Sequence, residues 1–294
     1  MTIDRGSLLE WCRIPWRELA THADRRVSLR IVRDSEEMGQ LMARELFDLV
    51  VENGAAGRQT RAIVPCGPMA WYGPFADLVN GAAQSLEGLV VFHMDECLDW
   101  QGRLLPAGHP FNFRSVMERV FYDPVDPRLR VPPAQRHWLT PETIESVAAA
   151  IAAQPTDLTL GGWGQDGHVA YNQSRRAPYH VIGLEELADS TIRIQENNLD
   201  TVIAVAQRQF GSAYQFVPPM SVTLGMRECL GAMRVRLFSD TGAWKQTALR
   251  IALFSEPDAE YPMTLLQRHT DAILTATIET ADHPISHHPE WELL

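Results

Sequence analysis

Segments that read as buried strands alternate with segments that read as helices along most of this 294-residue chain. Short runs of apolar and β-branched residues predict six strands, at 28–32, 61–65, 89–94, 157–160, 235–239 and 272–277. Helical spacing of apolar residues predicts helices over 38–49, 141–153 and 243–253, the first of them starting at Asp34 and Ser35. Strands separated by helical crossovers favour an α/β fold, with a largely parallel sheet and helices on both faces.

The predicted organisation is one α/β domain over 27–280 between two extensions. Residues 1–26 contain an amphipathic segment that is expected to pack on the body or on another subunit. Residues 281–294 hold three histidines near two prolines, but no carboxylate or cysteine at ligand spacing. We therefore expect a solvated tail rather than a metal site.

Charge and cysteine usage narrow the class of protein. The chain has 37 acidic against 26 basic residues, a net charge of −11, which disfavours nucleic acids and anionic membranes as partners. Its four cysteines form no CxxC pair, so a disulfide framework or a thiolate zinc site is not expected. No apolar run is long enough for a signal peptide core or a membrane span. These features predict a soluble cytoplasmic protein, and its size predicts an enzyme.

Polar and glycine-rich segments follow four of the predicted strands, at 66–69, 95–96, 161–168 and 240–245. In open parallel sheets, ligands bind beyond the carboxyl ends of the strands. The coincidence of all four segments with that edge predicts a single active site there.

The segment 161–168 reads GGWGQDGH. Its closely spaced glycines allow close backbone approach to a ligand, but they fit neither a Walker loop nor the dinucleotide fingerprint. A turn between Asp166 and His168 would place a carboxylate beside an imidazole, which suits proton transfer near neutral pH. A glycine turn with a capping Asp and a structural His explains the same pattern equally well.

The other candidates are charged side chains at the same edge. Asp95 and Glu96 follow a strand directly, where adjacent carboxylates either act as a general base or cap a turn. Lys245 precedes a helix, a position that suits an anion, and Arg193 could offer a bidentate fork to the same anion.

With these residues placed, the chain resembles the glucosamine-6-phosphate deaminase (isomerase) family, within the wider group that includes 6-phosphogluconolactonase. The resemblance covers about 27–280. It is carried by VFHMDE at 91–96, GGWGQDGHVAYN at 161–172, VTLGM at 222–226 and GAWKQTAL at 242–249. The HVAYN continuation is similar to the deaminase branch. The resemblance implies a Rossmann-like fold and an aldose–ketose isomerisation coupled to loss of ammonia, with neither metal nor organic cofactor.

The resemblance also implies a role for each matching residue. Asp95 would take the C2 proton of an open-chain amino sugar, and His168, oriented by Asp166, would assist ring opening. Lys245 and Arg193 would bind the phosphate. The remaining substrate-binding candidates are Gly67, Glu96, Gly162 and Gly164.

Two departures from the family pattern bear on these roles. Gln173 stands where the family has a catalytic glutamate, and an amide stabilises an imidazolium less than a carboxylate does. The loop at 65–72 reads PCGPMAWY, without a hydroxyl before Tyr72 and without an N–H on Pro68. A poor phosphate cradle predicts weaker phosphate binding or a changed substrate. Trp71 and Tyr72 either stack on a sugar or belong to the core.

Three functions remain open from the sequence. The first is an amino-sugar deaminase/isomerase acting on glucosamine 6-phosphate or a relative, forming a homo-oligomer. The second is a sugar-lactone hydrolase in which His168 activates water. The third is a non-catalytic sugar-binding relative, which the presence of Asp95, Asp166, His168 and Lys245 disfavours.

Overall fold

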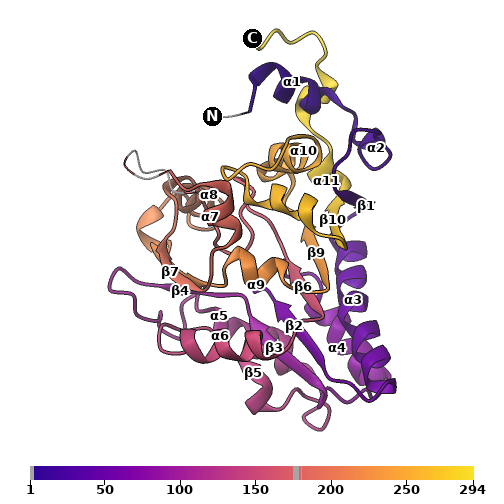
Figure 1. Cartoon of the computed structure of the whole chain (residues 1–294), viewed down its shortest axis with the longest axis vertical. Helices are drawn as coiled ribbons and strands as arrows, with labels where there is room; N and C mark the ends of the chain where they lie inside the picture. The colour runs from indigo at the N-terminus through magenta and orange to yellow at the C-terminus, as the bar shows by residue number, and fades with distance from the viewer. Residues whose placement is uncertain (1–2, 175–178, 180) are drawn as a thin grey trace.

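The computed structural model describes residues 3–174, 179 and 181–294 and is built around a seven-stranded parallel sheet (Figure 1). The strands, in spatial order, are β1 (Ser28–Val32), β10 (Ala272–Thr277), β9 (Arg234–Ser239), β6 (Leu158–Gly161), β2 (Thr60–Val64), β3 (Leu89–His93) and β5 (Arg136–His137). All neighbouring pairs are parallel. The six predicted strands are confirmed to within a residue or two at each end, as is the α/β class. The two-residue β5 was not predicted.

Helices cover both faces of this sheet. Successive residues of a strand point their side chains to opposite faces, so apolar strands place side chains that need covering on both of them. Ile63 belongs to the core that packs beneath α6 (Ile144–Ala153) and α10 (Gln246–Phe254). Its neighbours Ala62 and Val64 belong to the core beneath α3 (Ser35–Ala55) and α4 (Tyr72–Gly81). Near-continuous apolar strands are what a parallel sheet buried on both faces requires.

The three predicted helices are present, and two of them begin later than predicted. Helix α3 begins where the sequence indicates, since the Asp34 side chain accepts a hydrogen bond from Glu37 N at 2.9 Å. Helices α6 and α10 begin about three residues later than predicted. The remaining helices are α1 (Arg5–Arg13), α2 (Trp16–Leu19), α5 (Phe113–Met117), α7 (Leu184–Ala188), α8 (Leu199–Gln209), α9 (Met226–Leu230) and α11 (Ile278–Ala281).

A second sheet has three antiparallel strands, β4 (Asp95–Leu98), β8 (Met220–Thr223) and β7 (Arg193–Glu196). The sequence did not predict it, because β4 follows β3 after one residue and reads as the end of the same run. Its register places Asp95 opposite Thr223, which is itself opposite Arg193. The second sheet therefore fixes the backbone of Asp95 relative to segments far away in the chain.

The two ends of the chain pack together at one side of the molecule (Figure 1). Arg13 Nη2 in α1 donates to Trp291 O at 3.2 Å, and Arg5 Nη2 donates to Leu293 O at 3.2 Å. His283 is buried. The expectation of a solvated tail is therefore met only in part: residues 289–294 are exposed, but α1 donates hydrogen bonds to two of their carbonyl groups. None of the helices in the described parts of the chain has the length and apolar character needed to cross a membrane.

Candidate active site

A cavity of about 610 Å³ opens at the carboxyl ends of the parallel strands. The order of the strands reverses between the neighbours β2 and β6. From β2 the chain continues to β3 on one side of the sheet, whereas the strand that follows β6 in this sheet, β9, lies on the other side. Such a reversal leaves a crevice in an open α/β sheet. The loops after both strands line the cavity, and a Cβ atom placed on Gly162 would lie 3.9 Å from Gly67 O.

All four polar segments singled out in the sequence contribute to this cavity. The contributing predicted residues are Gly67, Asp95, Gly162, His168 and Lys245. A second cavity of about 620 Å³ lies against α8 and is lined by Trp100, Glu196, Tyr214 and other residues. It holds one carboxylate and no cation among its described lining residues, so it offers less to an acid–base reaction on a sugar phosphate.

Asp95 lies at the start of β4, with its side chain partly exposed to the cavity. Burial raises the pKa of this carboxyl to about 8, and the negative charge of Glu96 acts in the same direction. A carboxylate with a raised pKa is a stronger base than an exposed one. Asp95 therefore has the position and the basicity expected of a proton-abstracting group.

Glu96 points away from the cavity, which corrects its assignment as a substrate-binding residue. Its carboxylate accepts backbone N–H bonds from Cys97 at 3.0 Å, Phe113 at 2.7 Å and Arg114 at 2.8 Å. Two of these donors lie at the N-terminus of α5, whose amides lack partners within the helix. Burial raises the pKa of Glu96, although these hydrogen bonds oppose the change. The alternative reading of a capping carboxylate is correct here.

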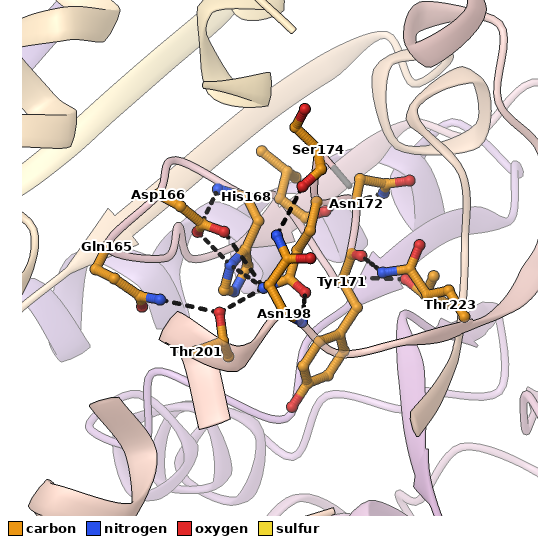
Figure 2. A network of polar contacts seen from close by, with 12 residues as sticks. Gln165, Asp166, His168, Tyr171, Asn172, Ser174, Asn198, Thr201 and Thr223 are labelled. Atoms are coloured by element: carbon orange, nitrogen blue, oxygen red, sulfur yellow. Dashed lines mark hydrogen bonds and ion pairs between the residues drawn. The ribbon is translucent and has the colours of Figure 1, made fainter. Parts of the chain in front are cut away.

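His168 and Asp166 form the predicted pair, with 2.6 Å between His168 Nδ1 and Asp166 Oδ1 (Figure 2). Burial acts to raise the pKa of Asp166, but the charge and hydrogen bonds of His168 outweigh it and hold this pKa below its ordinary value. An ionised Asp166 requires a proton on Nδ1 of the imidazole. The Nε2 atom is then left for a ligand in the cavity.

Gln173 is buried beside this pair and is hydrogen-bonded to it. Its Nε2 donates to Asp166 Oδ2 at 3.3 Å and to Thr201 Oγ1, while its Oε1 accepts from Asn198 N at 2.8 Å. Gln165 Nε2 also donates to Thr201 Oγ1, at 2.9 Å. The uncharged side chain of Gln173 thus connects Asp166 to the start of α8 by hydrogen bonds.

Gly164 lies beneath the imidazole rather than along the sugar cavity, contrary to its assignment as a lining residue. A Cβ atom at this position would lie 2.2 Å from His168 Nδ1 and 2.7 Å from Asp166 Oδ1. Only glycine leaves room for the pair in this arrangement. Gly164 therefore determines where His168 lies.

Lys245 lines the cavity from the segment that precedes α10, as predicted. Burial lowers the pKa of its ammonium group to about 8, and the positive charge of Arg208 acts in the same direction, against Asp240 and Asp166. Arg208 and Arg119 line the same cavity, and neither was a candidate from the sequence. Both lie outside the recognised motifs, where nothing in the sequence pattern marks them.

No protein-family model matches the chain. It is 28% identical to a glucosamine-6-phosphate deaminase of Shewanella loihica, over 76% of this chain and 80% of that protein. It is 27% identical to a glucosamine-6-phosphate deaminase of Caenorhabditis elegans, over 85% of this chain and 89% of that protein.

Solved structures show the same fold. A monomeric glucosamine-6-phosphate deaminase superimposes with a TM-score of 0.72 and 21% identity, covering 86% of this chain and 98% of that one. A 6-phosphogluconolactonase from Trypanosoma brucei gives a TM-score of 0.60 and 16% identity, covering 86% and 97%. The chain therefore shares its fold with these deaminases and lactonases.

Not every residue of the sequence motifs has the place that the resemblance implied. The structure places Arg193 on β7, outside the residues that line the cavity, and its Nη1 donates to Asn172 Oδ1 at 2.8 Å. Asn172 Nδ2 in turn donates to Val169 O and Leu224 O, each at 2.9 Å. Arg193 therefore braces the loop that follows His168, which corrects its assignment to the phosphate.

The loop after β2 also differs from a phosphate cradle. Cys66, Gly67 and Met69 line the cavity, but Trp71 and Tyr72 are buried in the core between α4 and the π-helical turn at Glu118–Tyr122. Tyr72 donates its hydroxyl proton to Pro65 O at 2.8 Å. Of the two roles open from the sequence, the core role is correct.

Within the described parts of the chain, no group of three or more histidine, cysteine, aspartate or glutamate side chains is arranged to hold a metal ion.

Proposed function

We propose that this protein is an amino-sugar phosphate deaminase/isomerase, which converts glucosamine 6-phosphate or a close relative to the ketose with release of ammonia. The observation that carries the proposal is one cavity that joins Asp95, the His168–Asp166 pair and Lys245. The similarity to glucosamine-6-phosphate deaminases over more than two thirds of each chain supports the same reaction.

Ring opening comes first, and His168 acts as its acid–base catalyst. Nε2 of the imidazole exchanges the proton between the ring oxygen and the anomeric hydroxyl, while Asp166 keeps the Nδ1 proton in place. The product is the open-chain aldose, whose C2 carries both the amine and an acidic hydrogen.

Isomerisation follows through Asp95. Its carboxylate takes the C2 proton, the electron pair forms a C1–C2 double bond, and the carbonyl oxygen at C1 gains a proton. Return of the proton to C1 leaves a C2 imine, which water hydrolyses to the ketone and ammonia. A raised pKa of about 8 lets the same carboxyl group both accept and return the proton near neutral pH.

The test is ammonia and ketose formation by the purified protein. The panel contains glucosamine 6-phosphate, unphosphorylated glucosamine and galactosamine, and N-acetylated and lactone controls. Removal of a general base typically costs 10²–10⁴-fold in rate, so Asp95→Asn is expected to reduce ammonia release by about 10³-fold. Asp99→Asn is the matched control and is expected to retain activity, because Asp99 directly follows β4, pairs with Arg103 and lies outside the residues that line the cavity.

Two outcomes would contradict this proposal. Lactone hydrolysis without ammonia release would identify a lactonase, in which His168 activates water. Binding of a sugar phosphate without any turnover would identify a non-catalytic relative.

The proposed assembly is a cytoplasmic homo-oligomer. One structural neighbour is described as monomeric, so the mass of the native particle is the decisive measurement. Light scattering of the full chain that gives a particle near the 33.0 kDa of one chain would contradict the oligomer.

A further inference from the structure

We infer that the second cavity, which lies against the first half of α8 and outside the proposed active site, binds an unphosphorylated amino sugar. Its volume of about 620 Å³ falls within the range of ligand sites in proteins, which is about 300–1,000 Å³. This site is separate from the proposed function, and it binds its ligand whether or not the protein deaminates a sugar phosphate.

The two cavities use different parts of helix α8. Leu199 and Val202, in its first half, line the second cavity, whereas Arg208 and Gln209, at its end, line the active-site cavity. None of the residues that the structure describes lines both cavities. A ligand in the second cavity therefore does not compete with a substrate for the same side chains.

The second cavity has an aromatic wall that is open to solvent. Trp100 is 73% exposed and Tyr214 is 51% exposed, although both are large and partly apolar. Trp100 is presented at the tip of a turn, in which Gly102 N donates to Asp99 O at 2.9 Å and Gln101 N donates to Asp99 Oδ1 at 2.8 Å. Exposed apolar residues that gather around one cavity indicate a binding site, and an aromatic face suits the C–H face of a sugar ring.

The polar groups beside this wall are available to a ligand. In the part of the chain that the structure describes, the side chains of Glu196, Tyr214 and Gln215 have no hydrogen-bond or ion-pair partner. Together they offer a hydroxyl group, an amide and a carboxylate, which can donate to and accept from sugar hydroxyls. A few polar groups among aromatic and apolar ones are typical of a site for a small polar ligand.

The backbone beneath these side chains is already fixed. Asn197 N donates to Pro219 O at 2.8 Å, and Asn197 Nδ2 donates to Pro218 O at 3.0 Å. Ser221 Oγ donates to Asn197 Oδ1 at 2.9 Å. Because this segment is ordered by its own hydrogen bonds, a ligand loses little free energy in ordering it.

The charge of the cavity identifies the class of sugar. Glu196 is the one charged side chain among its described lining residues, and it would repel a phosphate. An ammonium group is attracted both by a carboxylate and by the face of an aromatic ring such as that of Trp100. The second cavity is therefore suited to an amino sugar without a phosphate.

The experiment measures binding of methyl glucosaminide to the full chain by ligand-observed NMR titration at about pH 6, where the amine is protonated. The blocked anomeric centre of this glycoside prevents ring opening and therefore turnover. Methyl glucoside, with a hydroxyl in place of the amine, is the matched ligand.

The test variants are Trp100→Ala and Glu196→Gln, and each has a matched control. Trp291→Ala removes another exposed tryptophan, which lies outside both cavities. Asp240→Asn removes a carboxylate of the active-site cavity, where an ammonium group could otherwise bind.

Trp100→Ala is expected to weaken binding of both glycosides by about 3- to 10-fold, because both lose the same aromatic face. Glu196→Gln should weaken binding of methyl glucosaminide by about threefold, as the loss of an exposed ion pair predicts, and leave methyl glucoside unchanged. Trp291→Ala and Asp240→Asn should bind both glycosides as the wild type does.

Four results would overturn the inference. The first is the absence of saturable binding of methyl glucosaminide, and the second is equal affinity of the wild type for the two glycosides. The third is unchanged binding in Trp100→Ala together with a loss in Asp240→Asn, which would place the ligand in the active-site cavity. The fourth is a fall in particle mass in Trp100→Ala, measured by light scattering, which would show that a second copy of the chain covers this cavity.

Discussion

At the scale of single residues, the proposed reaction would depend on two groups whose pKa values are both about 8, Asp95 and Lys245. Asp95 must be deprotonated to act as a base, and its pKa of about 8 makes kcat/KM rise as the pH approaches that value. Lys245 must be protonated to bind phosphate, and its pKa of about 8 makes kcat/KM fall beyond that value.

We therefore expect a narrow bell-shaped profile of kcat/KM centred near pH 8 for the phosphorylated substrate. Lys245→Arg should remove the alkaline fall, because a guanidinium stays charged in this range. The profile for an unphosphorylated amino sugar should rise without falling. An alkaline fall that persists in Lys245→Arg would contradict the assignment of that limb to Lys245.

Gln173 carries the second prediction at this scale. Gln173→Glu would place a carboxylate where Nε2 now lies 3.3 Å from Asp166 Oδ2, in a buried site. Burial and the neighbouring charge raise the pKa of the new carboxyl in the folded state above its unfolded value of about 4.3. The variant should thus be destabilised increasingly as the pH rises above about 4.3, by roughly 1–3 kcal/mol at pH 8.

Urea denaturation at pH 5 and pH 8 measures this loss. Gln173→Leu is the control, because it removes the hydrogen bonds without adding a charge, so its loss should be the same at both pH values. Equal stability of Gln173→Glu and wild type at pH 8 would contradict the prediction. The weaker support that Gln173 gives to a charged imidazolium, relative to glutamate, stays a prediction.

At the scale of elements, Glu96 connects β4 to the N-terminus of α5. In Glu96→Gln, one amide oxygen would face the three backbone donors that the carboxylate now satisfies, and the amide NH₂ cannot accept any of them. We expect a loss of about 2–4 kcal/mol in the free energy of unfolding.

Glu118→Gln is the matched control, since Glu118 forms an exposed ion pair with Arg114 on the same segment. Such a pair contributes less than about 1 kcal/mol to the free energy of unfolding. Glu96→Gln also removes a charge that raises the pKa of Asp95, so the rising limb of its kcat/KM profile should move to lower pH. An unchanged stability and an unchanged limb would show that Glu96 does not act as a cap beside a catalytic base.

At the scale of the whole molecule, Arg250 joins the two ends of the chain to the body. This fully buried side chain on α10 donates from Nη2 to Ile14 O at 3.1 Å and to Ala281 O at 2.9 Å. Burial lowers its pKa to about 10, which leaves it charged at physiological pH.

Arg250→Met should remove both bonds and leave two carbonyl groups without a donor, at a cost of about 2–5 kcal/mol. Because Arg250 lies outside the cavity, the kcat of the folded variant should stay close to that of the wild type. Thermal denaturation and kcat at saturating substrate check the two parts. Arg17→Met, on the exposed part of α2, is the control and should change neither. A large fall in kcat without a loss of stability would contradict this role.

The sequence alone determined the parallel sheet, because strands such as 61–65 and 89–94 are apolar along their whole length and are separated by helical spacing. It also determined Asp95, Asp166, His168 and Lys245 as candidates, because local motifs at strand ends carry them. Only the tertiary structure decided what the remaining charged residues do. Glu96 faces a helix N-terminus 17 residues away, Arg193 reaches Asn172 across 21 residues, and Arg208 comes to the cavity on a helix without a motif. The physical reason is that hydrogen-bond partners and charges act through space, so distant segments that the fold brings together decide the direction and partner of each side chain.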